Sequence, residues 1–406
     1  MNSFLNTSKF ISFTTPALIL CALSSLGFLL LFWAKKTHNQ SIRYFFYIPA
    51  NKSKNQTLQL GGLPINLLFI STVIWLANKT STTVQEETIL FSSLVLYCGV
   101  LFYGYLDDRF EIRPIFKLAG QLFIALTYSL VTANTLHPFN SSVAFVFNFF
   151  MIMTTINGTN LLDGLDTMAF KIFAGTLGYF TILAMLISST TLALYSISLL
   201  GILLPFYFLN RPPAKVYLGE IGAGSLAMSA ITLSNLAFLT LTHTNQPLKA
   251  STYAVLPLLI PAMELIVSFV RRFLNKRSPF KGDRLHIHHI LRDHYKFSST
   301  QITNYYLFAQ VCLCTLGFFM IFSVGSIMGV VATVMFLNLL LLKFGQKHWV
   351  TKDLMPINLN SLFQLSLKSK VKIISGAALN DFQIHLLDPS TQPPYEYEQE
   401  EKNQVS

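Results

Sequence analysis

Charged residues are scarce in this sequence of 406 residues: Asp, Glu, Lys and Arg make up 12% of it, while 52% of the residues are hydrophobic. A soluble globular domain carries about a quarter charged residues. The scarcity therefore excludes an ordinary soluble domain and indicates lipid as the main solvent. The mean hydropathy of +0.51 agrees with this interpretation.

Cysteine is scarce as well. The four cysteines lie inside apolar runs and have the spacing of neither a zinc site nor a disulfide framework, so we expect them to pack as small apolar residues. Few basic residues precede the first apolar run, which is also too long for a cleaved signal peptide. We expect that run to be retained as the first membrane helix.

Long apolar runs, in contrast, are plentiful. A spanning helix needs about twenty mostly apolar residues, and unpaired backbone polar groups are not tolerated in hydrocarbon, so these runs must be helical. The sequence predicts an all-α, polytopic integral membrane protein with about eleven transmembrane helices. We expect residues 1–342 to form the membrane domain and residues 343–406 a cytoplasmic tail with a disordered acidic end. The expected spans are 16–34, 60–77, 87–106, 114–133, 142–156, 168–186, 190–210, 222–241, 253–270, 304–322 and 324–342.

The basic residues define an orientation. The side reached after odd-numbered spans holds 19 Lys and Arg before the tail, if Lys117 and Lys171 in the first turns of the next spans are counted with the loops. The opposite loops and the N-terminal segment hold three. The positive-inside rule places the basic side in the cytoplasm, with the N-terminus outside and the C-terminus inside. This distribution explains the net charge of +11 without a nucleic-acid partner.

Four polar clusters fall on the predicted cytoplasmic side. Asn157 and Asn160 share one helix face with Asp163 a turn further on, and we expect Gly164 to permit a turn that brings Asp163 near Asp166. Taken singly, the clusters also fit a solvated charged loop, a capped turn or a glycine-flanked hairpin. They comprise Asp107-Asp108-Arg109 with Lys117; Asn157, Asn160, Asp163 and Asp166; Gly219-Glu220 with Gly222 and Gly224; and Asp283-Arg284 with His286, His288 and His289.

Together the clusters have the chemistry of phosphoryl transfer. Carboxylates and amides suit a hard cation, while Arg, Lys and His suit phosphate, although three histidines could also bind a transition metal. Metal and cations would neutralise a diphosphate, and a carboxylate would orient the nucleophile. A site at the membrane boundary implies one substrate from water and one from the bilayer.

In motif order from about Gly61 to His289, the sequence resembles the polyprenyl-phosphate N-acetylhexosamine-1-phosphate transferases of glycosyltransferase family 4. The run from Asp283 to His289 is more similar to the GlcNAc branch than to the MurNAc-pentapeptide branch. The resemblance implies transfer of a hexosamine 1-phosphate, GlcNAc 1-phosphate first, from a UDP-sugar to undecaprenyl phosphate, with release of UMP. It also implies the bacterial inner membrane and the start of an envelope glycan such as O-antigen or a cell-wall polymer, and it leaves a homodimer open.

The resemblance also implies roles for individual residues, with Mg²⁺ as cofactor and Mn²⁺ as the alternative ion. It assigns catalysis to Asp107 and Asp108; substrate binding to Lys117, Asn157, Asn160, Asp163, Asp166, Arg284, His286, His288 and His289; and metal binding to Asp108, Asp163 and Glu220.

Two glutamates depart from the family pattern. Glu220 and Glu264 each stand where the family carries Asp, and the longer side chain shifts the carboxylate. Two other hypotheses follow: a catalytically impaired relative that acts as a membrane scaffold, and a cation-coupled transporter. A transporter predicts ionisable residues in the middle of spans. The middles of the expected spans are nearly free of such residues, with Glu264 as the clear exception, and this near absence argues against transport.

Overall fold

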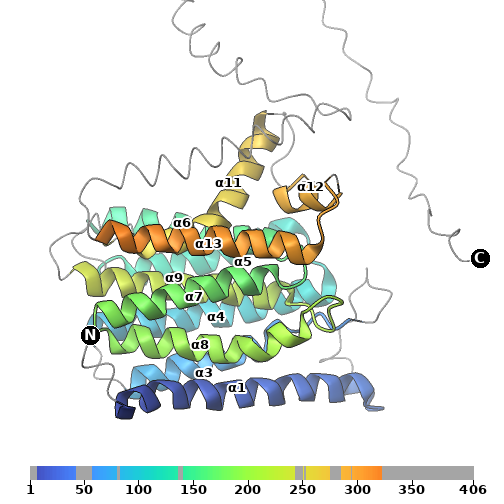
Figure 1. The fold of residues 1–406 in the computed structure, drawn as a ribbon, viewed down its shortest axis with the longest axis horizontal. Coiled ribbons are helices and arrows are strands. Elements are labelled where there is room, and N and C mark those ends of the chain that lie inside the picture. Colours follow the sequence, from blue (N-terminus) through green and yellow to red (C-terminus); the bar gives the residue numbers. More distant parts are fainter. Residues whose placement is uncertain are drawn as a thin grey trace, which may run out of the picture. The chain divides into compact units, whose positions relative to one another are not determined.

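A computed structural model describes residues 7–42, 57–79, 83–135, 140–242, 250, 253–274, 285–293 and 295–321. Within these residues the protein is helical, apart from one isolated bridge between Leu58 and Val216 (Figure 1). The helices are α1 (Thr7–Lys36), α3 (Gly62–Lys79), α4 (Val84–Phe110), α5 (Pro114–Thr132), α6 (Ser141–Leu162), α7 (Met168–Leu186), α8 (Thr190–Leu209), α9 (Gly219–Thr242), the 3₁₀ helix η1 (Leu256–Leu258), α11 (Leu259–Leu274), α12 (Ile287–Asp293) and α13 (Ser299–Ile321).

The structure confirms a polytopic, all-helical membrane protein. Eight helices in the described residues are long and apolar enough to cross a membrane, and the shorter apolar helix Gly62–Asn78 lies at the second expected span. The helix α13 occupies the tenth expected position. The expected span 324–342, the tail and its boundary at residue 343 lie outside the described residues.

Helix α9 is the most buried spanning helix. It contacts α3, α4, α6, α7 and α8, while α1 packs on α8 and α13 on α7 (Figure 1). Its sequence contains many small residues, which allow neighbouring backbones to approach closely. A Cβ on Gly62 of α3 would lie 2.0 Å from the backbone nitrogen of Gly222. Glycine at positions 62 and 222 therefore allows α3 and α9 to pack closely at this point.

The functional segments gather at one end of the packed helices. Helices α4, α6 and α8 end there, and α5, α7 and α9 begin there, because short connections join consecutive helices that pack against each other. Four backbone hydrogen bonds hold the segment before α3 beside the segment before α9. Two of them run from Gly61 N–H to the Tyr217 carbonyl at 3.0 Å and from Gly62 N–H to the Leu218 carbonyl at 2.8 Å. Residues distant in sequence thus meet at the start of α9.

Candidate active site

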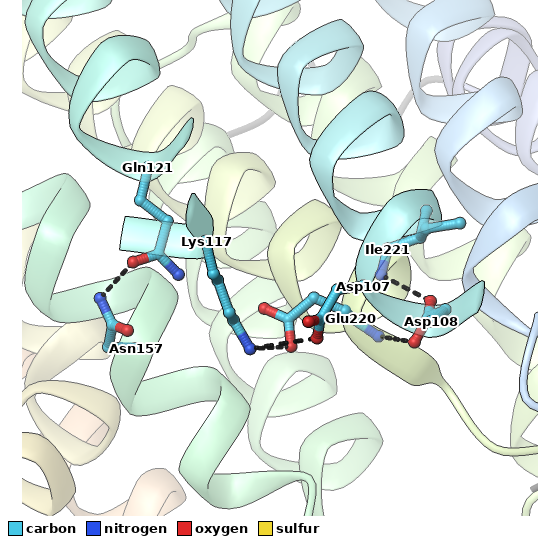
Figure 2. Close-up of polar contacts among 7 residues, drawn as sticks. All are labelled: Asp107, Asp108, Lys117, Gln121, Asn157, Glu220 and Ile221. Atoms are coloured by element: carbon cyan, nitrogen blue, oxygen red, sulfur yellow. Dashed lines mark hydrogen bonds and ion pairs between the residues drawn. The ribbon is translucent and has the colours of Figure 1, made fainter. Parts of the chain in front are cut away.

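The first part of the site lies where α4 ends and α9 begins (Figure 2). Asp108, in the last turn of α4, is buried, and its carboxylate accepts hydrogen bonds from the backbone N–H groups of Glu220 at 2.8 Å and Ile221 at 3.2 Å. The carboxylate thereby caps α9, whose free N–H groups and helix dipole favour negative charge. Gly219 adopts a φ of 72°, and a Cβ there would lie 2.8 Å from the Asp108 carboxylate, so the position requires glycine.

Lys117 joins two other carboxylates of this region. Its Nζ lies 2.5 Å from Glu220 Oε2 and 3.5 Å from Asp107 Oδ2 (Figure 2). The other oxygen of Glu220, Oε1, is buried and makes no hydrogen bond of good geometry among the described residues, although the Asn160 amide lies close by. One lysine therefore serves two carboxylates, and one buried carboxylate oxygen remains available to a ligand.

The last two turns of α6 carry the two asparagines. Asn157 donates from Nδ2 to Gln121 Oε1 of α5 at 3.1 Å (Figure 2), and Asn160 faces Glu220 from the same side of α6. The predicted shared helix face is confirmed by their positions within α6. The amides thus connect α5, α6 and α9 around the carboxylates.

Asp163 and Asp166 follow in the connection between α6 and α7. Burial, and then the negative charges of Asp108, Glu220 and Asp166, raise the pKa of Asp163 well above its usual range. Burial also raises the pKa of Asp166, against the effect of a backbone hydrogen bond from Ala214 N–H at 3.2 Å. Asp163 therefore lies in an excess of negative charge that a bound cation would relieve.

The expected turn between Asp163 and Asp166 is present, but our reason for Gly164 was wrong. The left-handed residue of this turn is Thr167, with a φ of 67°, and Gly164 does not adopt a positive φ. Gly164 is instead required for space, since a Cβ there would lie 2.7 Å from His288 Nε2. The aspartate turn and the histidine cluster are therefore in direct contact.

His288 of α12 and His286, which directly precedes α12, lie beside Glu264 of α11. His286 Nδ1 lies 3.6 Å and His288 Nδ1 lies 4.0 Å from the Glu264 carboxylate, which also accepts a short hydrogen bond from the Tyr306 hydroxyl of α13. Ser268 contacts His286 Nδ1 at 3.0 Å. All three histidines lie together, with ring centroids of His288 and His289 4.3 Å apart. Glu264 thus fixes the position of α12 between α11 and α13.

A polar cavity of about 580 Å³ opens beside these groups. It includes Asp163, Asp166 and Gly219 from the predicted motifs, whereas Arg292 comes from the end of α12. The cavity is lined by Gln59, Glu111, Asp163, Gly164, Leu165, Asp166, Asn210, Tyr217, Gly219, Arg292 and Ser299.

Several of these lining residues were missed by the sequence analysis. Tyr217 lies two residues before Gly219, just outside the glycine cluster that we had identified. Arg292 lies three residues after His289 and so shares its helix face, a spacing that could have identified it. Arg284 and Asp283, which we predicted from the same motif as the histidines, lie outside the described residues.

The donor set can be tested for a metal ion. Among the described residues, no group of three His, Cys, Asp or Glu is gathered closely enough to hold a metal by itself. The buried Glu220 Oε1 and the raised pKa of Asp163 nevertheless fit a hard cation, which prefers carboxylate oxygens and takes remaining ligands from water or substrate phosphate. Both oxygens of Asp108 already accept backbone hydrogen bonds.

Comparisons with known proteins identify a matching family model and several proteins of similar sequence. A family model described as Glycosyl transferase family 4 matches residues 90–238. Over 259 residues, the chain is 28% identical to the probable undecaprenyl-phosphate N-acetylglucosaminyl 1-phosphate transferase of Bacillus subtilis (strain 168), covering 60% of this chain and 68% of the relative.

Two further relatives represent both branches of the resemblance. The chain is 29% identical over 209 residues to the phospho-N-acetylmuramoyl-pentapeptide-transferase of Bacillus subtilis (strain 168), covering 46% of this chain and 62% of the relative. It is 27% identical over 224 residues to the undecaprenyl-phosphate alpha-N-acetylglucosaminyl 1-phosphate transferase of Yersinia pestis, covering 51% and 60%. The matches thus span between 60% and 68% of these three relatives.

Proposed function

Since the chain belongs to the polyprenyl-phosphate hexosamine-1-phosphate transferases, we propose that it transfers GlcNAc 1-phosphate from UDP-GlcNAc to undecaprenyl phosphate in a bacterial inner membrane. The observation that supports this most is the convergence of Asp107, Lys117, Glu220 and Asp163 from α4, α5, α9 and the turn after α6. Lys117 contacts Asp107 and Glu220, and Asp163 lies within the electrostatic reach of Glu220. Such a group of carboxylates with a lysine beside it is suited to a metal-assisted reaction between two phosphates.

In the proposed reaction, an oxygen of the lipid phosphate attacks the β-phosphorus of the sugar nucleotide. A new P–O bond forms to the lipid phosphate, the bond between the β-phosphorus and the bridging oxygen breaks, and UMP leaves with that electron pair. Mg²⁺, when bound, would neutralise the diphosphate. Glu220 and Asp163 would hold the ion, because Glu220 offers a buried unpaired oxygen and Asp163 lies among like charges.

The two adjacent aspartates take different roles in this proposal. Asp108 caps α9 with both carboxylate oxygens, so it positions the start of that helix and Glu220 with it. Asp107 is less buried, with 21% of its side chain exposed, and its described ion pair is the longer contact with Lys117 at 3.5 Å. Asp107 is therefore the better placed of the two to orient the lipid phosphate or accept its proton.

The apolar surface of the protein supports a lipid substrate. A groove of about 710 Å³, formed mainly by α6 and α11, is lined almost entirely by apolar atoms. Val146, Phe150 and Ile266 are among its residues. An isoprenoid chain in this groove would avoid water while its phosphate reaches the cytoplasmic helix ends.

The test uses purified protein in undecaprenyl phosphate-containing vesicles with Mg²⁺ and labelled UDP-GlcNAc. We expect organic-extractable label and an equal amount of UMP, both lost in Asp107→Asn and in the presence of a chelator. UDP-GalNAc and UDP-MurNAc-pentapeptide serve as matched donors to identify the sugar. A folded protein that labels lipid with none of the three donors would contradict the proposal and favour the scaffold hypothesis.

A further inference from the structure

The polar cavity has an unbalanced lining. Three of its lining residues are acidic, namely Glu111, Asp163 and Asp166, whereas Arg292 is the one lysine or arginine among its described lining residues. A diphosphate that enters this cavity meets repulsion from the carboxylates unless cations offset them. Among the described lining residues, Arg292 is the side chain that can supply such a charge directly.

Contacts within α12 hold the Arg292 guanidinium in place. Its Nε donates to Asp293 Oδ1 at 3.0 Å, and its Nη2 donates to His289 Nδ1 at 3.1 Å. A guanidinium has five N–H donors, so three further donors are left for a ligand. With 31% of its side chain exposed, Arg292 is also open to the cavity. A planar, held guanidinium is suited to bidentate recognition of phosphate.

The same contact determines the protonation of His289. A guanidinium cannot accept a hydrogen bond, so His289 Nδ1 must be the acceptor. The ring proton then resides on Nε2, and the imidazole is neutral while this contact is present. In this contact the imidazole N–H lies at Nε2, and the positive charge belongs to Arg292.

We propose that Arg292 is the cation that binds the diphosphate of the sugar nucleotide in this cavity, and that it holds His289 as a neutral Nε2–H donor. The inference rests on the proposed function and extends it to a residue outside the motifs by which we recognised the family. Arg292 is in this respect a substrate-binding residue, and for His289 it is a positioning residue.

The test separates charge from hydrogen bonding through matched variants. Arg292→Gln keeps a donor toward His289 and loses the charge, Arg292→Lys keeps the charge and loses the planar fork, and Arg113→Gln is the control at an exposed arginine outside the cavity lining. Binding of UDP and of uridine is measured by calorimetry, and KM and kcat are measured with UDP-GlcNAc.

We expect Arg292→Gln to weaken UDP binding and to raise KM by about 10- to 100-fold, the range for hydrogen bonds to a charged group. Arg292→Lys should lie between this variant and the parent, and Arg113→Gln should match the parent. Uridine binding should be unchanged in all variants, which shows that they are folded. Arg292→Ala, which also removes the donor to His289, should lower kcat further than Arg292→Gln.

The outcomes distinguish this inference from the proposed function. If the parent transfers GlcNAc 1-phosphate but Arg292→Gln binds UDP as the parent does, the role of Arg292 is wrong while the proposed function stands. Equal kcat values for Arg292→Ala and Arg292→Gln would overturn the role assigned to His289. If the parent neither binds UDP nor transfers the sugar phosphate, both the function and this inference are wrong.

Discussion

Two buried glutamates, Glu220 in α9 and Glu264 in α11, stand in contrasting surroundings. Glu220 forms an ion pair with Lys117 through one oxygen, while its other oxygen has no well-formed hydrogen bond among the described residues. Both oxygens of Glu264 face polar groups, because Tyr306 and His288 lie at Oε1 and His286 lies at Oε2. A carboxylate with one oxygen that lacks a well-formed hydrogen bond can still bind a ligand. A carboxylate with polar groups at both oxygens is instead suited to holding the neighbouring helices in place.

The partners differ in chemistry as well. Lysine stays charged across ordinary pH, so Glu220 is paired with a permanent cation, whereas imidazoles are charged only when protonated. Breaking a buried ion pair leaves an uncompensated charge, which is more costly than losing a hydrogen bond to a neutral group. The comparison therefore predicts unequal effects of mutation at the two sites.

The largest effect is expected for Lys117→Met. The change leaves Glu220 buried without its cation and should destabilise the protein by about 3–5 kcal/mol. Transfer should fall by at least about 1,000-fold, because the displaced carboxylate no longer has a fixed position. Thermal unfolding in detergent and the labelled-lipid assay measure the two effects.

A double variant provides the control for Lys117. Lys117→Met with Glu220→Gln removes both charges, so much of the lost stability should return while transfer stays low. If the double variant is no more stable than Lys117→Met alone, the ion pair does not account for the loss.

A smaller effect is expected for Glu264→Gln. The amide retains an oxygen for the Tyr306 hydroxyl but loses the negative charge beside His286 and His288. We expect a loss of about 1–3 kcal/mol in stability and of about 10- to 100-fold in kcat/KM, since α12 would be held less firmly. The matched variant Tyr306→Phe removes the hydrogen bond and keeps the carboxylate. A loss larger than that of Lys117→Met would reverse the comparison.

Gly164→Ala tests whether the two regions act together. The new methyl group would lie 2.7 Å from His288 Nε2, so the imidazole or the aspartate turn must move. We expect transfer to fall by about tenfold, with a stability loss of about 1–3 kcal/mol from overpacking. Gly178→Ala is the control, because no heavy atom lies within 4 Å of a Cβ at that position. Equal activity of the two variants would show that the contact at Gly164 does not matter for transfer.

The helices were largely predictable from the sequence because membrane spans are a local signal. A run of about twenty apolar residues must form a helix in the membrane, because a helix pairs all of its backbone polar groups. The polar clusters mark where these helices end. The clusters were therefore identified, and their placement at one end follows from alternating helix direction. The orientation of the termini in the membrane stays a prediction.

The partners within the site were not predictable, because they depend on how helices pack. Lys117 and Glu220 are 103 residues apart, and no local pattern identifies them as an ion pair. The role of Asp108 as a cap on α9 likewise required the backbone of another helix. Gly164 shows the limit most clearly: glycine was expected for its backbone freedom, but it is needed for space beside His288.

The last predicted effect concerns pH and connects Asp163 to Glu220. The raised pKa of Asp163 keeps this carboxyl protonated to a higher pH than usual, and a metal ion must displace that proton. Raising the pH should therefore tighten Mg²⁺ binding, so the half-saturating Mg²⁺ concentration should fall by up to about tenfold per pH unit below that pKa. Transfer rates at graded Mg²⁺ between about pH 6 and about pH 8 measure how the half-saturating Mg²⁺ concentration depends on pH.

Two variants provide the controls. Asp163→Asn should flatten this slope, whereas Glu264→Gln should leave the slope unchanged, because Asp108, Glu220 and Asp166 are the charges that raise the pKa of Asp163. If the slope is unchanged in Asp163→Asn, the proton that the metal displaces belongs to another group. If the slope disappears in Glu264→Gln, the charges of Glu264 and Glu220 act on the same titrating group, and the contrast between the two glutamates is wrong.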